Sequence, residues 1–279
     1  MIEIKNLSFG YSSKKLLYHN LSLSISKGSV SGLLGKNGAG KSTLLKNIAG
    51  TLFPVEGSVL VNGVVPAKRK PSFLQTIYYI PEDVYVPALG IKKYVDLFSP
   101  FYPNFSHDSF YSYLKQLEVD ETAKLNKLSF GQQKKFIIAF ALACNTSLLL
   151  MDEPTNGLDI PSKVQFRKLI ASEMNEERII VISTHQTRDL ENMIDRVIIV
   201  DDGKLLLNAD VQQITEKLCF KTVKEIEPDA RVLYKEAMLR GMAVVIENRE
   251  GEDSKLNLEH LFNGVTESPA LTKDIFTLN

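Results

Sequence analysis

The chain has 279 residues, of which 44% are hydrophobic and 24% charged, values ordinary for a globular protein of one domain and a small extension. Lys and Arg number 33, as do Asp and Glu, so the balanced charge disfavours a strongly basic nucleic-acid binder. The longest apolar run, Phe136–Cys144, falls far short of the roughly 18 residues that a spanning helix needs. The first five residues do not resemble a signal peptide, and the two cysteines suggest no disulfide framework. We therefore expect a cytoplasmic protein whose membrane role would go through a partner.

Segments near the N-terminus predict strands with one buried face. Ile2 to Phe9 alternates apolar and polar residues, and Leu17 to Ile25 does so again. Ser58 to Val61 is a third strand candidate, and Asn62-Gly63 after it is typical of a tight hairpin turn.

A glycine-rich stretch between these strands fits the pattern G-x-x-x-x-G-K-[ST]. It reads Gly35-Lys36-Asn37-Gly38-Ala39-Gly40-Lys41-Ser42-Thr43. Its glycines allow successive backbone N–H groups to point into one concavity at a helix N-terminus, which suits a polyphosphate. Lys41 is then expected to reach the β- and γ-phosphates, and the Ser42 hydroxyl to ligate Mg²⁺. A short apolar strand before the motif and a helical apolar face after it provide the required strand–loop–helix setting, so we predict nucleotide binding.

Residues 78 to 113 are unusually aromatic and are punctuated by prolines. We expect short helices at Ile91 to Phe98 and at His107 to Leu117, forming a helical insertion in a larger domain. The aromatic residues fit the insertion's own core, and the alternative is that some line a groove for a partner helix.

From residue 147 onward, apolar strands alternate with helices, which predicts a mainly parallel α/β sheet. Ser147 to Met151 ends in the acidic pair Asp152-Glu153, and Arg178 to Ser183 leads to Thr184-His185. A helix is expected from Pro161 to about residue 175, and further strands at Arg196 to Val200 and Lys204 to Leu207.

With these motifs in this order, residues 1–215 resemble the nucleotide-binding subunit of an ATP-binding-cassette (ABC) transporter. Leu148 to Glu153 resembles the Walker B strand, and Leu128-Ser129-Phe130-Gly131-Gln132 resembles the family signature LSGGQ. The resemblance implies an α/β P-loop NTPase core with an antiparallel β subdomain and a helical insertion at about 83–143. It also implies ATP and Mg²⁺ as cofactors.

The resemblance assigns roles around the nucleotide. Tyr11 takes the position of an aromatic residue that stacks on adenine, and Asp152 is implied to hold Mg²⁺ directly or through water. Glu153 is implied to orient and deprotonate the attacking water. His185 matches the switch histidine, whose imidazole reaches the γ-phosphate. Lys41, Glu153 and His185 are therefore the expected catalytic residues.

Other motifs imply a dimer that sandwiches two ATP molecules. Ser129, Gly131 and Gln132 belong to the signature, which binds the γ-phosphate held by the opposite subunit, whereas Phe130 replaces the first glycine of the pattern. Asp159 ends Asn156-Gly157-Leu158-Asp159, which resembles the D-loop at the dimer interface.

One position departs from the family pattern. Where the family has Gln at the start of the insertion, this chain has Glu82, within Tyr79-Ile80-Pro81-Glu82-Asp83. Glu82 is expected either to approach Mg²⁺ as an anion or to stay withdrawn until a partner moves the insertion.

The tail, residues 216–279, is expected to be a small α+β accessory extension, loosely similar to those of drug-export and bacitracin-resistance type cassettes.

The resemblance implies an ATPase that powers a separate membrane permease, with export expected. It also implies a homodimer, or a heterodimer with another ABC subunit, located at the inner face of the membrane through the permease. The alternatives are a soluble cassette in DNA maintenance or on the ribosome, a regulator that binds ATP without turnover, and a small-molecule kinase. A long coiled coil, a second cassette and a charged linker are missing from the sequence, which disfavours the soluble alternatives.

Overall fold

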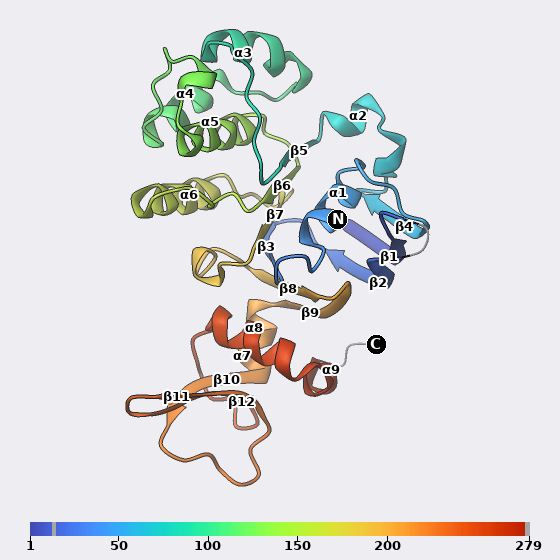
Figure 1. The fold of residues 1–279 in the computed structure, drawn as a ribbon, viewed down its shortest axis with the longest axis vertical. Coiled ribbons are helices and arrows are strands. Elements are labelled where there is room, and N and C mark those ends of the chain that lie inside the picture. Colours follow the sequence, from blue (N-terminus) through green and yellow to red (C-terminus); the bar gives the residue numbers. More distant parts are fainter. Residues whose placement is uncertain (13–14, 277–279) are drawn as a thin grey trace.

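The computed structural model describes residues 1–12 and 15–276. Its helical insertion, central α/β part and C-terminal unit lie one after another along the longest axis of the molecule, with the antiparallel β part beside the centre (Figure 1). Each of the three sheets belongs to one of these regions: one is antiparallel and N-terminal, one is central, and one is C-terminal. The fold class predicted from the sequence is confirmed.

The N-terminal antiparallel sheet has the strand order β2-β1-β4. Its strands are β1 (Ile2–Phe9), β2 (Tyr18–Ile25) and β4 (Glu56–Val61). The alternating apolar residues of β1 and β2 are buried on one face. Asn62 and Gly63 both have positive φ, 48° and 77°, and the backbone groups of Val61 and Val64 exchange hydrogen bonds across them, as the sequence predicts for a tight turn.

The central sheet has six strands in the order β5-β6-β7-β3-β8-β9, and only β9 is antiparallel to its neighbour. Its strands β3, β6 and β7 are buried at every residue, which explains why they read as continuous apolar runs. The strands are β5 (Ile77–Ile80), β6 (Leu148–Asp152), β7 (Ile179–Thr184), β3 (Ser29–Leu34), β8 (Arg196–Asp201) and β9 (Lys204–Asp210).

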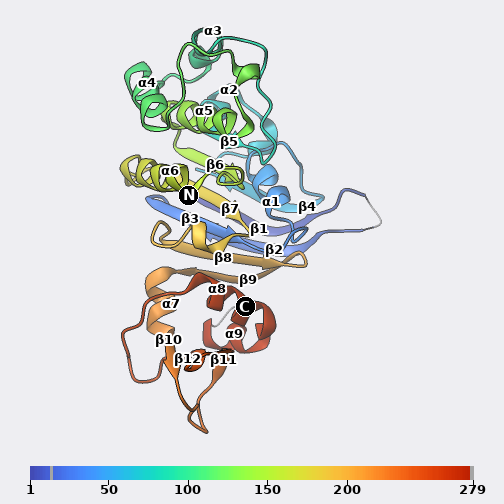
Figure 2. The same ribbon diagram turned by 60° about the vertical axis from the view of Figure 1, so that its left-hand side comes forward.

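Two apolar clusters cover the two faces of the central sheet. One contains α1 (Lys41–Ile48) and the inner face of the N-terminal sheet. The other contains α5 (Phe130–Ala143) and α6 (Ile160–Ser172), which lie on the opposite side (Figure 2). Successive residues of β6 alternate between the clusters, Leu149 and Met151 against Leu148 and Leu150. The carboxyl ends of β3, β6 and β7 therefore hold the P-loop, the acidic pair and His185 at one edge.

The insertion contains α3 (Ile91–Phe98), α4 (His107–Gln116) and α5. Its aromatic residues form a core around Phe140, whose ring centroid lies 5.2 Å from that of Tyr94 and 5.1 Å from that of Phe105. Tyr85 and Phe101 are instead 88% and 65% exposed. Shorter helical segments complete this half of the chain: α2 (Pro71–Leu74), η1 (Pro66–Lys68), η2 (Ser99–Phe101) and η3 (Leu125–Lys127).

The C-terminal unit holds α7 (Val211–Lys217), β10 (Leu218–Val223), β11 (Val232–Met238), β12 (Gly241–Glu247), α8 (Leu258–Glu267) and α9 (Pro269–Phe276). The sequence predicts strand or mixed segments at Arg231 to Met238 and Ala243 to Glu247 and a short helix at Leu256 to Phe262, which match β11, β12 and the start of α8. It does not indicate α7, β10 or α9. Buried residues of this unit, including Leu258, Leu261 and Val265 of α8, belong to the same apolar cluster as β8 and β9. The unit therefore packs on the edge of the central sheet.

Candidate functional site

A cavity of about 900 Å³ opens beside the P-loop, at the carboxyl edge of the central sheet. Ten of the site residues predicted from the sequence line it: Tyr11, Asn37, Gly38, Gly40, Lys41, Ser42, Thr43, Glu82, Glu153 and His185. Gly35 and Lys36 line a smaller neighbouring cavity of about 230 Å³. The fold thus brings together residues from five separate stretches of the sequence.

The P-loop joins β3 to α1 and depends on glycine at specific positions. Gly38 and Gly40 have φ values of 80° and 108°, a region that L side chains rarely adopt. A Cβ atom on Gly35 would lie 2.6 Å from the carbonyl oxygen of Val200. The phenol of Tyr18 donates a hydrogen bond to the carbonyl of Gly40 at 2.6 Å and so stabilises the end of the loop.

Lys41, the first residue of α1, is buried, with a relative exposure of 7%. Its ammonium donates to the carbonyl oxygens of Gly35 at 2.8 Å and Lys36 at 3.2 Å. It also lies 3.6 Å from a carboxylate oxygen of Glu153. A buried ammonium among backbone N–H groups at a helix N-terminus is suited to bind an anion.

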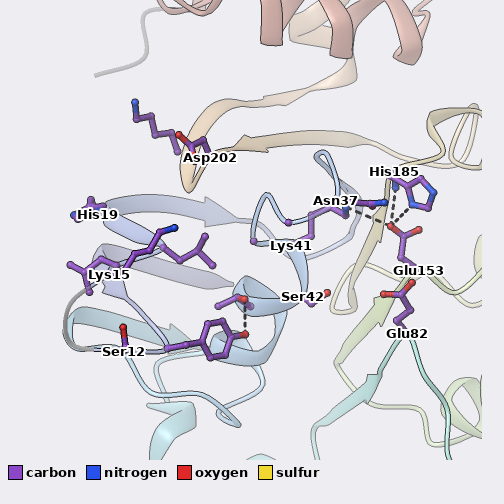
Figure 3. A pocket seen from close by; sticks show the side chains of 17 residues that line it. Ser12, Lys15, His19, Asn37, Lys41, Ser42, Glu82, Glu153, His185 and Asp202 are labelled. Carbon is purple, nitrogen blue, oxygen red and sulfur yellow. Dashed lines mark hydrogen bonds and ion pairs between the residues drawn. The ribbon is translucent and has the colours of Figure 1, made fainter.

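Glu153 follows β6 and is almost completely buried, although its carboxylate lines the cavity. Its Oε1 accepts a hydrogen bond from the backbone N–H of His185 at 3.0 Å and lies 2.8 Å from the Nδ1 of that residue. Its Oε2 accepts a hydrogen bond from the hydroxyl of Thr184 at 3.0 Å. Figure 3 shows His185 and Lys41 both reaching the carboxylate of Glu153. A carboxylate held in this way can orient water and accept its proton.

Asp152 and Ser42 offer oxygen ligands to a divalent cation. Asp152 is buried, and its carboxylate accepts hydrogen bonds from the hydroxyl groups of Ser183 at 2.5 Å and Tyr79 at 3.3 Å. Burial raises the pKa of Tyr79, so this phenol stays a donor. Among the described residues, no group of three or more His, Cys, Asp or Glu side chains could hold a metal by itself. Mg²⁺ that arrives with a nucleotide needs only one or two protein oxygens, and these residues fit that requirement.

Comparisons with known proteins agree with this geometry. A family model described as ABC transporter matches residues 18–156. The chain is 32% identical to the ABC transporter ATP-binding protein YtrB of Bacillus subtilis (strain 168), over 78% of this chain and 74% of that protein. It is 31% identical to the SkfA peptide export ATP-binding protein SkfE of the same strain, over 78% of this chain and 92% of that protein.

The chain belongs to the ABC transporter ATP-binding protein family. Among solved structures, the dimeric ATP-binding cassette MJ0796 in a post-hydrolysis state, bound to ADP and Pi, matches with a TM-score of 0.65 and 26% identity, over 76% of this chain and 99% of that chain. A second structure, of an ATP-binding subunit of an ABC transporter, shares the fold with a TM-score of 0.70 at 24% identity. The chain is accordingly an ABC ATPase that binds and hydrolyses ATP.

The segment that resembles the ABC signature, Leu128 to Gln132, does not line the cavity of its own chain. Ser129 caps the N-terminus of α5: its hydroxyl accepts from the N–H of Gln132 at 3.3 Å, while the Oε1 of Gln132 accepts from the N–H of Ser129 at 3.1 Å. Phe130, in place of the family's first glycine, is 48% exposed and packs over Gly157. A Cβ atom on Gly131 would lie 2.9 Å from the carbonyl oxygen of Gly157, which explains why this second glycine is present.

Asp159 ends the segment that resembles the D-loop, and it also does not line the cavity. Its side chain caps α6 by accepting a hydrogen bond from the N–H of Ser162 at 2.9 Å. Hydrogen bonding from the side chain of Ser162, together with that from its backbone N–H, holds the pKa of Asp159 below its usual value.

Glu82 and Tyr11 both line the cavity, and each makes its own side-chain contact. Glu82 is exposed below Glu153 (Figure 3), and its Oε1 accepts a hydrogen bond from the Asn156 side chain at 3.4 Å. Tyr11 is 70% exposed, and its phenol lies 2.9 Å from the hydroxyl oxygen of Thr43. Its ring packs edge-on against Phe9, with the centroids 5.2 Å apart.

The sequence did not indicate several residues that organise this site. Tyr18, Ser183 and Thr184 hold Gly40, Asp152 and Glu153 respectively. Ser183 and Thr184 end β7 directly before His185, and this position is a signal that could have identified both of them. No described helix is both long and apolar enough to cross a membrane.

Proposed function

We propose that this chain is the ATP-hydrolysing subunit of an ABC exporter, in which it drives a separate membrane permease. The observation that carries the proposal is the position of Lys41, Glu153 and His185 at one end of the P-loop cavity. One relative, SkfE of Bacillus subtilis (strain 168), is a peptide export ATP-binding protein. Intact binding and catalytic groups favour turnover over a role in nucleotide binding alone.

In the proposed reaction, the phosphates of ATP lie against the backbone N–H groups of the P-loop. The ammonium of Lys41 contacts the β- and γ-phosphates, and the exposed ring of Tyr11 stacks on adenine. Ser42 and Asp152 would hold Mg²⁺, which would supply positive charge to the phosphates when bound. Glu153 orients water and accepts its proton as the water oxygen attacks the γ-phosphorus. The bond from that phosphorus to the β–γ bridging oxygen breaks, which yields ADP and inorganic phosphate.

His185 connects the base to the phosphate in this proposal. Its Nδ1 lies 2.8 Å from the Oε1 atom of Glu153, and the residue lines the cavity. The Nε2 atom can donate to the γ-phosphate when it carries a proton. One side chain can therefore hold the base and stabilise the charge that develops on the phosphate.

We further propose that two copies sandwich two ATP molecules. Ser129, Gly131 and Gln132 begin a helix whose first N–H groups are suited to contact a γ-phosphate, yet they lie outside the cavity of their own chain. A second subunit would bring its signature to this cavity, with Asp159 at the interface. A homodimer, or a heterodimer with another ABC subunit, satisfies this geometry.

The permease is proposed to dock on the helical insertion. Tyr85 and Phe101 there are exposed, whereas most of the neighbouring aromatic residues are buried or half-buried, and Tyr85 follows Glu82 closely in the chain. A docked permease would place the chain at the inner face of the membrane and could move Glu82 relative to Glu153.

The proposal is tested by purifying the tagged full chain from detergent-solubilised membranes of its native host. We expect a polytopic membrane protein to co-purify in a stable ratio, and to raise the Mg²⁺-dependent ATPase activity when both are reconstituted. Recovery with ribosomes or DNA, and with no membrane protein, would replace the proposal with that of a soluble cassette.

A further inference from the structure

Lys134 is a completely buried lysine, in the second turn of α5, five residues after the signature serine. Burying an ammonium group is unfavourable unless polar partners replace the water that it loses. This burial lowers the pKa of Lys134, while the nearby carboxylates of Glu82 and Glu153 act in the opposite direction. A side chain kept buried at this cost is a candidate for a specific role.

The ammonium of Lys134 binds two backbone carbonyl groups in the segment that follows β6. It donates to the carbonyl oxygen of Glu153 at 2.7 Å and to that of Asn156 at 3.2 Å. It also lies 5.4 Å from the ring centroid of Phe130, within the range of a cation–π contact. Lys134 therefore contacts the Walker B end, the D-loop and the signature at once.

The backbone of Glu153 needs such a contact. Its φ is 46°, in the left-handed region, which is strained for a residue other than glycine and persists only where the surroundings hold it. The N–H of Glu153 donates to the carbonyl oxygen of Ser183 at 3.1 Å. Lys134 holds the opposite side of the residue by binding its carbonyl oxygen.

Asn156 connects Lys134 with Glu82, the residue that differs from the Gln of the family pattern. Its side-chain amide donates to Glu82 at 3.4 Å and its Oδ1 accepts from Gln186 at 3.2 Å, next to His185. Lys134 binds the backbone carbonyl of the same Asn156. One lysine thus fixes both the residue that carries the base and the residue that connects Glu82 with the His185 loop.

We propose that Lys134 is a positioning residue for ATP hydrolysis, which holds Glu153 in its left-handed backbone conformation so that the carboxylate faces the cavity. The inference rests on the proposed role of Glu153 as the base. The helix α5 begins at the signature, which in the proposed dimer faces the nucleotide of the partner subunit. Lys134 therefore also connects this helix with Glu153, the proposed catalytic base of its own subunit.

The first test compares Lys134→Met with Lys134→Gln. Met keeps the length of the side chain and removes its donors, so we expect kcat to fall about 10- to 100-fold, as displacement of a reacting group by roughly 1 Å does. KM for ATP and nucleotide affinity should stay within about twofold, because the P-loop contacts are unchanged. Gln keeps two N–H donors and should recover part of the lost rate. Lys168→Met, on the exposed face of α6, is the matched control and should behave as the unmodified protein.

The second test uses the Glu153→Gln/Lys134→Met double variant. If Lys134 acts through Glu153, the double variant is no slower than Glu153→Gln alone. Multiplied losses would overturn the inference, as would a folded Lys134→Met protein with unchanged kcat. If both single variants at Lys134 fail to fold, as judged by thermal melting, Lys134 supports the core and the positioning role is wrong. Full activity of Glu153→Gln itself would instead refute the proposed base, so failure of each proposal can be told apart.

Discussion

The Nδ1 atom of His185 lies 2.8 Å from the Oε1 atom of Glu153, and the backbone N–H of His185 donates to that same oxygen at 3.0 Å. One carboxylate oxygen thus contacts both the ring and the main chain of His185. When Nδ1 is the donor, Nε2 needs a second proton before it can also donate to a phosphate. The contact therefore ties the orientation of the histidine to the residue proposed as the base.

The His185→Ala variant tests this link. Removing the ring removes a donor to the γ-phosphate and one partner of Glu153, so we expect kcat to fall by about 10²–10³, the loss typical of one transition-state donor. ATP binding should survive because the P-loop is untouched. Steady-state ATPase activity and equilibrium binding of a fluorescent ATP analogue measure the two quantities. Equal losses in both would show that His185 serves binding rather than the transition state.

Glu153→Gln separates binding from hydrolysis. The amide keeps the shape of the side chain but cannot accept the proton of water, so we expect a loss of roughly 10²–10⁴ in kcat. ATP and Mg²⁺ should then trap a dimer that elutes earlier on gel filtration. Glu176→Gln, at an exposed position, serves as the control. A monomer that persists at saturating ATP would argue against a sandwich formed by this subunit alone.

Lys41→Ala removes the buried ammonium that contacts Gly35, Lys36 and Glu153. We expect most ATP binding to be lost, because no other P-loop side chain can place a positive charge at this depth. Isothermal titration with ATP and Mg²⁺ measures the affinity, and Lys68→Ala, which changes an exposed lysine, is the control. Near-normal affinity and turnover would contradict the assignment of the phosphate site.

Glu82→Gln restores the residue type of the family pattern. The carboxylate is exposed at the cavity and adds negative charge near the proposed position of the triphosphate. We expect basal ATPase activity of the isolated subunit to rise about three- to tenfold, since one screened charge near 4 Å contributes about 1 kcal/mol. Stimulation by the permease should weaken. Glu121→Gln is an exposed control. Lower basal activity with weaker Mg²⁺ dependence would instead assign Glu82 to the metal.

Leu261→Ala tests how the C-terminal unit is joined to the rest of the chain. Leu261 is fully buried in α8, within the apolar cluster that includes β8 and β9. We expect the free energy of unfolding to fall by about 2–5 kcal/mol. Leu239→Ala, at a completely exposed position, should change it by less than about 0.5 kcal/mol. Urea unfolding followed by two probes should show one transition, whereas two separate transitions would indicate an independently folding extension.

The sequence by itself determined the elements that rest on local patterns. The alternation in β1 and β2, the apolar run of β6 and the P-loop spacing predicted their structures because each depends on neighbouring residues and a regular period. The P-loop motif assigned Lys41 and the resemblance assigned Asp152, Glu153 and His185 in advance. The fold places Lys41, Glu153 and His185 around one cavity, with Asp152 beside them at the end of β6.

Only the tertiary structure decided which groups hold those residues. The bonds from Tyr18 to Gly40 and from Lys134 to Glu153 join segments 22 and 19 residues apart, and no periodicity connects them. Lys134 reads as one of several basic residues near the signature, because a sequence records its charge but not its burial. The packing of α8 against β8 and β9 could not be predicted from the sequence either. An amphipathic pattern indicates which face of a helix is apolar, but it does not indicate which surface packs against that face.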